Sequence, residues 1–207
     1  MNAFVLAGGR STRMGRDKAL LELNGRPLIE HALAKLRDLG FSPRIAGSRN
    51  DLSSFAPVVA DNFAQAGPLG GMEAALAASD SDLNLFLPVD LPWLPVEFLR
   101  WMMERAERTN ALATVPRAQG QPQPLCAVYG RAMLPHARAA LAEGNSKVTL
   151  AVERAAVATG LRIDSFDAES VASSQLWEQR LPVYCWFRNL NSLEDFETAL
   201  EQFRRIP

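Results

Sequence analysis

A segment of glycines and cations near the start of the chain carries the most suggestive chemistry. Residues 6–18 read LAGGRSTRMGRDK and follow a short apolar run, Phe4 to Leu6, that is typical of a buried strand entering a turn. Gly8 and Gly9 lack a Cβ atom, so their backbone N–H groups can approach an anion closely. Cationic side chains lie in the same segment, at Arg10, Arg13, Arg16 and Lys18. This clustering needs an anionic partner and favours a polyphosphate, whereas the alternative of a solvated turn leaves it unexplained.

The segment differs from two common phosphate-binding loops. It lacks the GK[ST] ending of a Walker loop and the G-x-G-x-x-G spacing of a dinucleotide-binding fold. Lys18 is also one of only three lysines in the chain, with Lys35 and Lys147. The sequence therefore predicts a phosphate site of another kind, with Lys18 and Arg13 as its candidate catalytic cations.

An acidic residue comes directly after another predicted strand. Asp90 follows the apolar run Leu83 to Val89 and precedes a Leu-Pro pair. Ligands in open α/β sheets bind at the carboxyl ends of the strands, so Asp90 is expected at the same sheet edge as the glycine segment. One carboxylate, with phosphate oxygens and waters, suffices to hold Mg²⁺. The alternative is an N-cap for the helix that begins near Pro95, but Asp90 lies several residues too early for that role.

The composition narrows the classes of function. The chain of 207 residues has 22 basic and 23 acidic side chains, for a formal net charge of −1. Proteins that hold nucleic acid by neutralising phosphates need a basic excess, so no nucleic acid partner is expected. Cys126 and Cys185 lie far apart and beside no histidine pair, which predicts no disulfide framework or zinc site and favours a reducing cytoplasm. No apolar run approaches the ~20 residues of a membrane span, so no membrane association is expected.

Short apolar runs alternate with segments of helical period along the chain. From Leu28 to Leu39 apolar residues recur at helical spacing, between Pro27 and Gly40. Further strands are predicted at 44–46, 57–60, 83–89, 112–115, 125–129 and 183–187, and further helices at 69–78, 95–108, 131–142, 146–155 and from Ser192 onward. The alternation predicts one α/β domain over residues 1–207, with a Rossmann-like, mostly parallel sheet and helices on both faces. Residues 156–180 are left unassigned, and the polar loop 118–124 is expected either at a site edge or in solvent.

Several motifs, in order along the chain, resemble those of one family. They are LAGG, RMG and DK within residues 6–18, LELNGRPLIEHAL at 21–33, Asp61 after the third strand, GPLGG at 67–71, PVDLPWLP at 88–95, QPLCAVY at 123–129 and NLN at 189–191. Together they are similar to the nucleotidyltransferases that activate small molecules with a nucleoside triphosphate, most closely the molybdenum cofactor guanylyltransferase (MobA-like) family. The similarity covers almost the whole chain and leaves out residues 151–182.

The resemblance implies a fold of the nucleotide-diphospho-sugar transferase type. It also implies transfer of GMP from GTP to the terminal phosphate of molybdopterin, with release of pyrophosphate. The nucleotide-binding residues that it implies are Leu6, Ala7, Gly8, Gly9, Lys18, Asp61 and Asp90, and the magnesium ligands are Asp90 and Asn191. Expected partners beyond the substrates are transient contacts with molybdenum-insertion proteins and with the molybdoenzymes that accept the finished cofactor.

Two of the implied roles have plain structural alternatives. Asp61 could form an Asx turn with Asn62, and Asn191 could be a turn amide before a helix capped by Ser192. The chain also departs from the family pattern at one loop. In many family members this loop supplies an asparagine to the base, whereas here it reads AGSRN at 46–50. Ser48 or Asn50 could substitute for that asparagine.

Two other functions remain open at this point. Relatives that use cytidine typically show LAAG in place of LAGG, and DQP in place of Asp90, Leu91 and Pro92, so the LAGG motif and Leu91 favour guanine. A nucleotidyltransferase that uses CTP or a sugar-phosphate acceptor is the nearest alternative. A non-catalytic nucleotide-binding module is the other, and it would have no use for a metal-binding carboxylate opposite a triphosphate loop.

Overall fold

A central sheet brings together strands from the whole length of the chain. The computed structural model describes residues 1–7, 17–175, 177 and 181–188. Within them the main sheet has eight strands in the order β10-β7-β9-β6-β1-β4-β5, with β8 paired to β7. The strands are β1 (Asn2–Leu6), β4 (Arg44–Ala46), β5 (Val58–Val59), β6 (Leu83–Pro88), β7 (Ala113–Ala118), β8 (Gln121–Pro122), β9 (Ala127–Gly130) and β10 (Ile163–Asp167). All pairings on the main path are parallel except those of β9 with β6 and with β7, which confirms the predicted, mostly parallel sheet.

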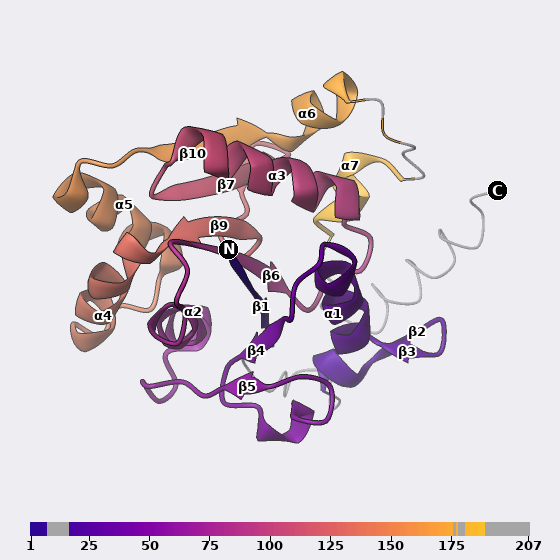
Figure 1. Ribbon diagram of the computed structural model, residues 1–207, viewed down its shortest axis with the longest axis horizontal. Helices are drawn as coiled ribbons and strands as arrows, with labels where there is room; N and C mark the ends of the chain where they lie inside the picture. Colours follow the sequence, from indigo (N-terminus) through magenta and orange to yellow (C-terminus); the bar gives the residue numbers. More distant parts are fainter. Residues whose placement is uncertain (8–16, 176, 178–180, 189–207) are drawn as a thin grey trace.

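Helices cover both faces of this sheet, as predicted (Figure 1). One layer contains α1 (Leu28–Asp38), α3 (Val96–Thr109), α6 (Ala168–Ser174) and α7 (Val183–Trp186), and the other contains α2 (Gly67–Ala77), α4 (Leu134–Ala142) and α5 (Val148–Thr159). Strand β1 shows how the two cores form, because alternate side chains of a strand point to opposite faces. Ala3 and Val5 pack into the core under α1 and α3, whereas Phe4 and Leu6 pack into the core under α2 and α4.

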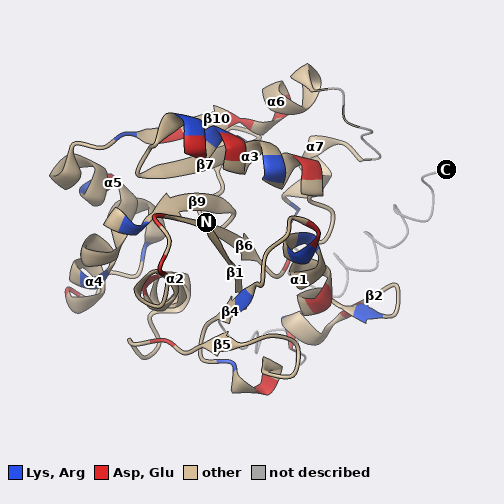
Figure 2. Ribbon diagram, in the orientation of Figure 1, with Lys and Arg blue, Asp and Glu red and all other residues tan. Residues whose placement is uncertain are grey.

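The helix boundaries follow local sequence signals. Helix α1 begins after Pro27, buries the predicted apolar stripe and is followed by Gly40, whose φ of 88° favours glycine. Helix α3 begins after Pro95 and ends at Thr109, and the residue that follows, Asn110, adopts the left-handed conformation with φ 45°. Its outer face carries acidic and basic side chains in alternation (Figure 2). Before α1, the short hairpin of β2 (Glu22–Leu23) and β3 (Arg26–Pro27) turns at Asn24 and Gly25, both with positive φ.

One predicted element is wrong in type. The apolar run 183–187 predicts a strand, but Val183–Trp186 form the single helical turn α7. Trp186 is buried there and its ring lies 5.4 Å from that of Phe98 on α3. A short apolar run has no period that separates a strand from a buried helical turn, so burial against α3 decides the conformation.

The stretch that the sequence left unassigned also has a definite structure. After α5, the chain forms β10, which pairs in parallel with β7, and then α6, which Asp167 caps by accepting a hydrogen bond from the Ser170 backbone N–H. The helix expected from Ser192 onward lies outside the described residues.

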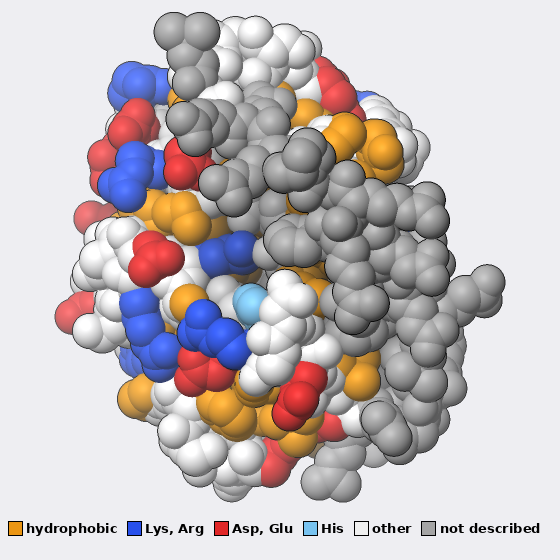
Figure 3. Space-filling model, turned by 90° about the vertical axis from the view of Figure 1, so that its right-hand side faces the viewer, with side chains coloured by type: hydrophobic (Ala, Val, Ile, Leu, Met, Phe, Trp, Pro, Cys, Tyr) orange, Lys and Arg blue, Asp and Glu red, His pale blue; other side chains and the backbone are white. Residues whose placement is uncertain are grey.

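One face of the molecule is mixed in charge. On the face shown in Figure 3, the described Lys and Arg side chains are interspersed with Asp, Glu and hydrophobic side chains. None of the helices in the described residues combines the length and the hydrophobicity that a membrane-spanning helix requires. Cys126 and Cys185 are both buried free thiols.

Lys35 gives the fold a testable pH dependence. Burial on α1 lowers the pKa of its ammonium from 10.5 to about 8, and Asp38 and Glu97 oppose the shift. At a pH below the pKa that Lys35 has in the folded protein, the lysine is charged in both the folded and the unfolded protein. The folded protein then bears the full cost of burying that charge. Between the folded and unfolded pKa values the unfolded chain binds more protons, so stability rises with pH. Because Lys35 is only half-buried, we expect Lys35→Met to raise the free energy of unfolding by about 1–2 kcal/mol at pH 7.

The gain from Lys35→Met should shrink as the pH approaches 10.5, the unfolded pKa of lysine. Urea unfolding of both proteins at several pH values between 7 and 10 measures this difference. A gain that stays constant over that range would show that the ammonium is solvated in the folded protein.

Candidate active site

The carboxyl ends of four neighbouring strands, β5, β4, β1 and β6, surround a cavity. Its volume is about 220 Å³. The described residues that line it are Leu6, Lys18, Ala46, Asp61, Gly67, Pro68, Gly71, Pro88, Val89, Asp90 and Leu125. Four residues predicted as nucleotide-binding, Leu6, Lys18, Asp61 and Asp90, thus meet around one cavity although they lie far apart in the sequence.

The other predicted site residues fall into two groups. Ala7 is buried beside the cavity, where its backbone N–H donates to the Ala46 carbonyl at 3.3 Å. Gly8, Gly9, Arg13 and Asn191 lie outside the described residues, so their roles stay predictions.

Lys18 and Asp90 form an ion pair at the cavity. Lys18 Nζ donates to Asp90 Oδ2 at 2.7 Å, and each side chain is 16% exposed. Lys18 begins the 3₁₀ turn Lys18–Leu20, and Asp90 follows β6, where the Val89 backbone N–H donates to the Leu6 carbonyl at 3.2 Å. The two charges are partly desolvated and open to the cavity, which strengthens their interaction with a charged ligand.

Asp90 does not cap helix α3. That helix begins at Val96, its N-cap residue is Pro95, and no side chain makes a capping hydrogen bond there. The structural alternative for Asp90 is therefore wrong, and Asp90 instead lines the cavity.

Asp61 presents a free acceptor to the site. Its Oδ2 accepts from the Ser48 backbone N–H at 3.3 Å, and its own N–H donates to Ser48 Oγ at 3.1 Å. Its Oδ1 is buried and has no hydrogen-bond partner among the described residues. Burial raises the pKa of Asp61, while the Ser48 hydrogen bonds pull it down in part. A buried acceptor without a donor is costly, so Oδ1 is expected to accept from a bound ligand.

A hydrogen bond to helix α2 fixes the residue that follows Asp61. Asn62 donates through Nδ2 to Glu73 Oε2 at 2.9 Å, and the fully buried Glu73 also accepts from Arg138 Nε at 2.6 Å. Helix α2 carries Glu73 and begins at the cavity with Gly67 and Pro68, so the positive end of its dipole faces the site.

Neither candidate substitute for the base-reading asparagine lines the cavity. Ser48 hydrogen-bonds with Asp61, and Asn50 is exposed at the start of the 3₁₀ turn Asn50–Leu52. Ser48 thus contacts Asp61 rather than the cavity, and any contact of either side chain with a base remains a prediction.

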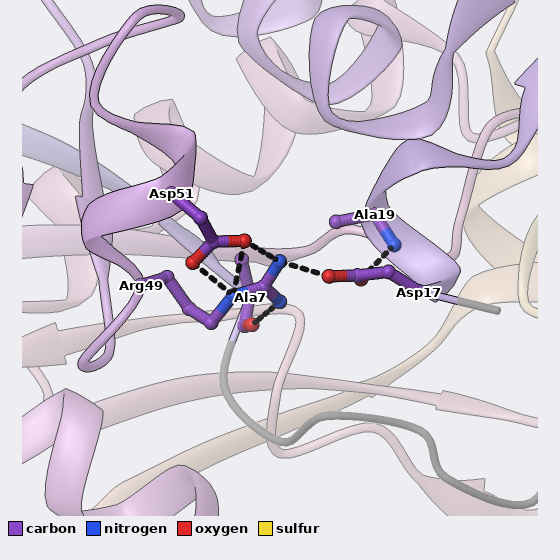
Figure 4. Close-up of polar contacts among 5 residues, drawn as sticks. All are labelled: Ala7, Asp17, Ala19, Arg49 and Asp51. Atoms are coloured by element: carbon purple, nitrogen blue, oxygen red, sulfur yellow. Dashed lines mark hydrogen bonds and ion pairs between the residues drawn. The ribbon is translucent and has the colours of Figure 1, made fainter. Parts of the chain in front are cut away.

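One buried residue near this site has no clear signal in the sequence. Arg49 is 3% exposed, and its guanidinium contacts Ala7, Asp17 and Asp51 (Figure 4). Its position after the short strand β4, with Asp51 two residues later, is a weak signal, because such a pair is more often found on the surface.

The donor set suits a metal that is carried mainly by the substrate. Among the described residues no group of three or more His, Cys, Asp or Glu side chains could enclose a metal ion. Asp90 supplies one carboxylate at the cavity. Mg²⁺ usually keeps several waters and binds through one or two carboxylates and substrate phosphates, so the residues present fit this ion.

Known proteins are similar to this chain in sequence and in fold. Residues 3–157 match the MobA-like NTP transferase domain. A probable molybdenum cofactor guanylyltransferase of Methanothermobacter thermautotrophicus is 36% identical over 203 residues, which cover 92% of this chain and 94% of that protein. A molybdenum cofactor guanylyltransferase of Vibrio atlanticus is 34% identical over 150 residues, which cover 70% of this chain and 77% of that protein.

A solved structure extends the likeness to the whole fold. The molybdopterin-guanine dinucleotide biosynthesis protein A of Archaeoglobus fulgidus superposes with a TM-score of 0.78 at 24% identity, covering 99% of this chain and 100% of that one. The mostly parallel sheet between two helical layers is thus the nucleotide-diphospho-sugar transferase type of fold expected from the motifs. The chain belongs to the MobA-like NTP transferase family.

Proposed function

We propose that this protein transfers GMP from GTP to the terminal phosphate of molybdopterin, forming the guanine dinucleotide and releasing pyrophosphate. The observation that carries the proposal is the Lys18–Asp90 pair at 2.7 Å, which lines one cavity together with the unpaired acceptor of Asp61. The names of the relatives from Methanothermobacter thermautotrophicus and Vibrio atlanticus support the guanylyl donor and the cofactor acceptor.

The reaction depends on offsetting phosphate charge and on positioning the two substrates, and it needs no general base. An oxygen of the acceptor phosphate forms a bond to the α-phosphorus of GTP, and the bond from that phosphorus to the bridging oxygen breaks, so pyrophosphate leaves with the electron pair. The attacking oxygen is already anionic, so no protein group has to remove a proton. Lys18 offsets negative charge on the triphosphate, with Arg13 as a second proposed cation, and the cavity holds donor and acceptor for an in-line displacement.

Asp90 is the proposed ligand for Mg²⁺, with Asn191 as a second candidate. Nucleotidyltransferases are typically metal-dependent. When bound, the ion neutralises phosphate charge and stabilises the leaving pyrophosphate. Lys18, whose Nζ lies 2.7 Å from Asp90 Oδ2, would bind triphosphate oxygens beside the carboxylate that would hold the ion.

We also propose the extent of the domain, its compartment and its protein partners. Residues 1–207 form one nucleotidyltransferase domain that works in the cytoplasm, which the two free buried thiols support. Molybdenum-insertion proteins and acceptor molybdoenzymes are proposed as transient partners.

Pyrophosphate release separates this function from its alternatives. With molybdopterin present, we expect release with GTP to exceed that with CTP, and omission of the acceptor to abolish it. Release with CTP alone, or with a sugar phosphate in place of molybdopterin, would assign another nucleotidyl transfer. Binding of GTP without release under any of these conditions would identify a non-catalytic module.

Asp61 supplies a prediction about nucleotide affinity. We expect Asp61→Asn to raise the KM for GTP by about 10–100-fold and to change kcat by less than about threefold, because it weakens a charge-assisted hydrogen bond to the bound nucleotide. Because burial raises the pKa of Asp61, its carboxylate is protonated at a higher pH than that of an exposed aspartate. On acidification, the KM of the wild type for GTP should therefore begin to rise at that higher pH. Steady-state kinetics across pH measures both effects, and an unchanged KM would remove Asp61 from the nucleotide site.

A further inference from the structure

Arg49 links three segments of the chain through one buried guanidinium (Figure 4). Its Nη1 donates to the Ala7 carbonyl at 3.0 Å, and its Nε donates to Asp51 Oδ1 at 3.0 Å. Its Nη2 donates to Asp51 Oδ2 at 2.8 Å and also to Asp17 Oδ2. Ala7 and Asp17 are the described residues on either side of 8–16, the glycine and arginine segment.

Burying an arginine costs free energy unless its N–H donors form hydrogen bonds. The planar guanidinium offers five N–H donors in a fixed fork, so it can hold acceptors from separate segments in one plane. Lysine has a single rotating ammonium and cannot reproduce this geometry. Hydrogen bonding to Asp51 raises the pKa of Arg49 above its already high value, so the charge is permanent.

Two of the three partners of Arg49, Ala7 and Asp17, are next to residues that line the cavity. Ala7 follows Leu6, which lines the cavity. Asp17 precedes Lys18, and its Oδ1 caps the 3₁₀ turn by accepting from the Ala19 backbone N–H at 3.0 Å, while its Oδ2 faces Arg49. Arg49 itself does not line the cavity.

We propose that Arg49 is a positioning residue for nucleotidyl transfer, which fixes Asp17 against the end of β1 and thereby sets Lys18 beside Asp90. This proposal rests on the proposed function, since the reaction it serves is GMP transfer. Arg49 acts through Asp17 and Ala7 and touches no reacting atom. The expected loss is large because a misplacement of about 1 Å in a catalytic group costs on the order of 100-fold in rate.

Four variants test the proposal. Arg49→Met removes the guanidinium and keeps much of the apolar stem. Asp17→Asn breaks the link to Arg49, because an amide group cannot replace a carboxylate as its ionic partner, yet Asn still caps the 3₁₀ turn. Arg49→Lys keeps the charge without the fork. Arg105→Met is the matched control, since Arg105 makes a comparable pair with Asp164, at 2.7 and 2.8 Å, between α3 and β10 and away from the cavity.

We expect kcat to fall by about 100-fold in Arg49→Met and by about tenfold in Asp17→Asn, with the KM for GTP within about threefold of the wild type. The effect falls on kcat because Asp61 and the rest of the cavity wall remain. Arg49→Lys should recover only part of the loss, and Arg105→Met should keep the wild-type kcat.

Limited digestion with trypsin supplies a readout that does not depend on activity. Cleavage after Arg10, Arg13 and Arg16 should quicken by about tenfold in Arg49→Met and Asp17→Asn, because both ends of that segment lose an anchor. The rate of these cleavages in Arg105→Met should equal that of the wild type.

The proposal is overturned if Arg49→Met matches the wild type in kcat and in cleavage rate. It is also overturned if Arg105→Met loses as much activity at an equal loss of thermal stability, since Arg49 would then be merely structural. Should Arg49→Met fail to fold, Asp17→Asn decides alone, by the same two readouts. Should the wild type release no pyrophosphate with any nucleotide, the proposed function fails, and the cleavage rates still decide whether Arg49 holds this segment.

Discussion

Replacing Lys18 with alanine is expected to lower kcat for pyrophosphate release by about 10³-fold, or about 4 kcal/mol of transition-state stabilisation. The Lys18 ammonium is the described cation that lines the cavity, and the negative charge of the leaving pyrophosphate grows as the α–β bond breaks. Truncation leaves Asp90 without its 2.7 Å partner, but both side chains are 16% exposed, so the fold should survive. Stopped-flow or coupled detection of pyrophosphate, with GTP and molybdopterin at saturation, measures the effect.

Lys147→Ala is the matched control for Lys18→Ala. Lys147 is exposed before α5, and its replacement removes one of the same three lysines without touching the cavity. We expect it to keep the wild-type kcat. A Lys18→Ala protein that folds and turns over at the wild-type rate would remove Lys18 from the reaction.

Replacing Asp90 with asparagine is expected to lower kcat by about 10²–10³-fold and to raise the Mg²⁺ concentration needed for half-maximal rate. Asparagine keeps the shape of the side chain but removes the charge that a hard cation requires. A purely structural role for Asp90 would lower the rate without changing the metal dependence. Titration of the rate with Mg²⁺ at saturating GTP distinguishes the two.

Asp80→Asn serves as the control for that experiment. Asp80 is exposed before β6, at the amino ends of the strands, where its Oδ1 accepts from Asn2 Nδ2 at 2.7 Å. It should show the wild-type rate and the wild-type metal dependence. If Asp90→Asn also responds to Mg²⁺ as the wild type does, the ion is not held by Asp90.

The central features of the site could be predicted from the sequence because they depend on topology. Parallel strands place their carboxyl ends at one sheet edge, so residues that follow separate strands meet without any contact being visible in the sequence. Leu6, Asp61 and Asp90 each come at or just after such an end, and all three line the cavity. The same reasoning places Lys18, in the segment after β1, at this edge of the sheet.

The features that could not be predicted depend on side chains meeting across the fold. Arg49 has an ordinary local sequence, and its role appears only when Ala7 and Asp17 are brought around it. The partnership of Ser48 with Asp61 likewise joins β4 and β5 through a pairing of loop residues. The strand expected at 183–187 is a helical turn because packing against Phe98, rather than period, sets its conformation.

The most direct test of the account is the identity of the product formed when nucleotides compete. The wild-type protein is incubated with molybdopterin, Mg²⁺ and equal concentrations of GTP, CTP, ATP and UTP, and the dinucleotides are identified by mass spectrometry. We expect the guanine dinucleotide to be the dominant product, formed in equal amount with pyrophosphate. A dominant cytosine dinucleotide, or pyrophosphate without any pterin dinucleotide, would contradict it.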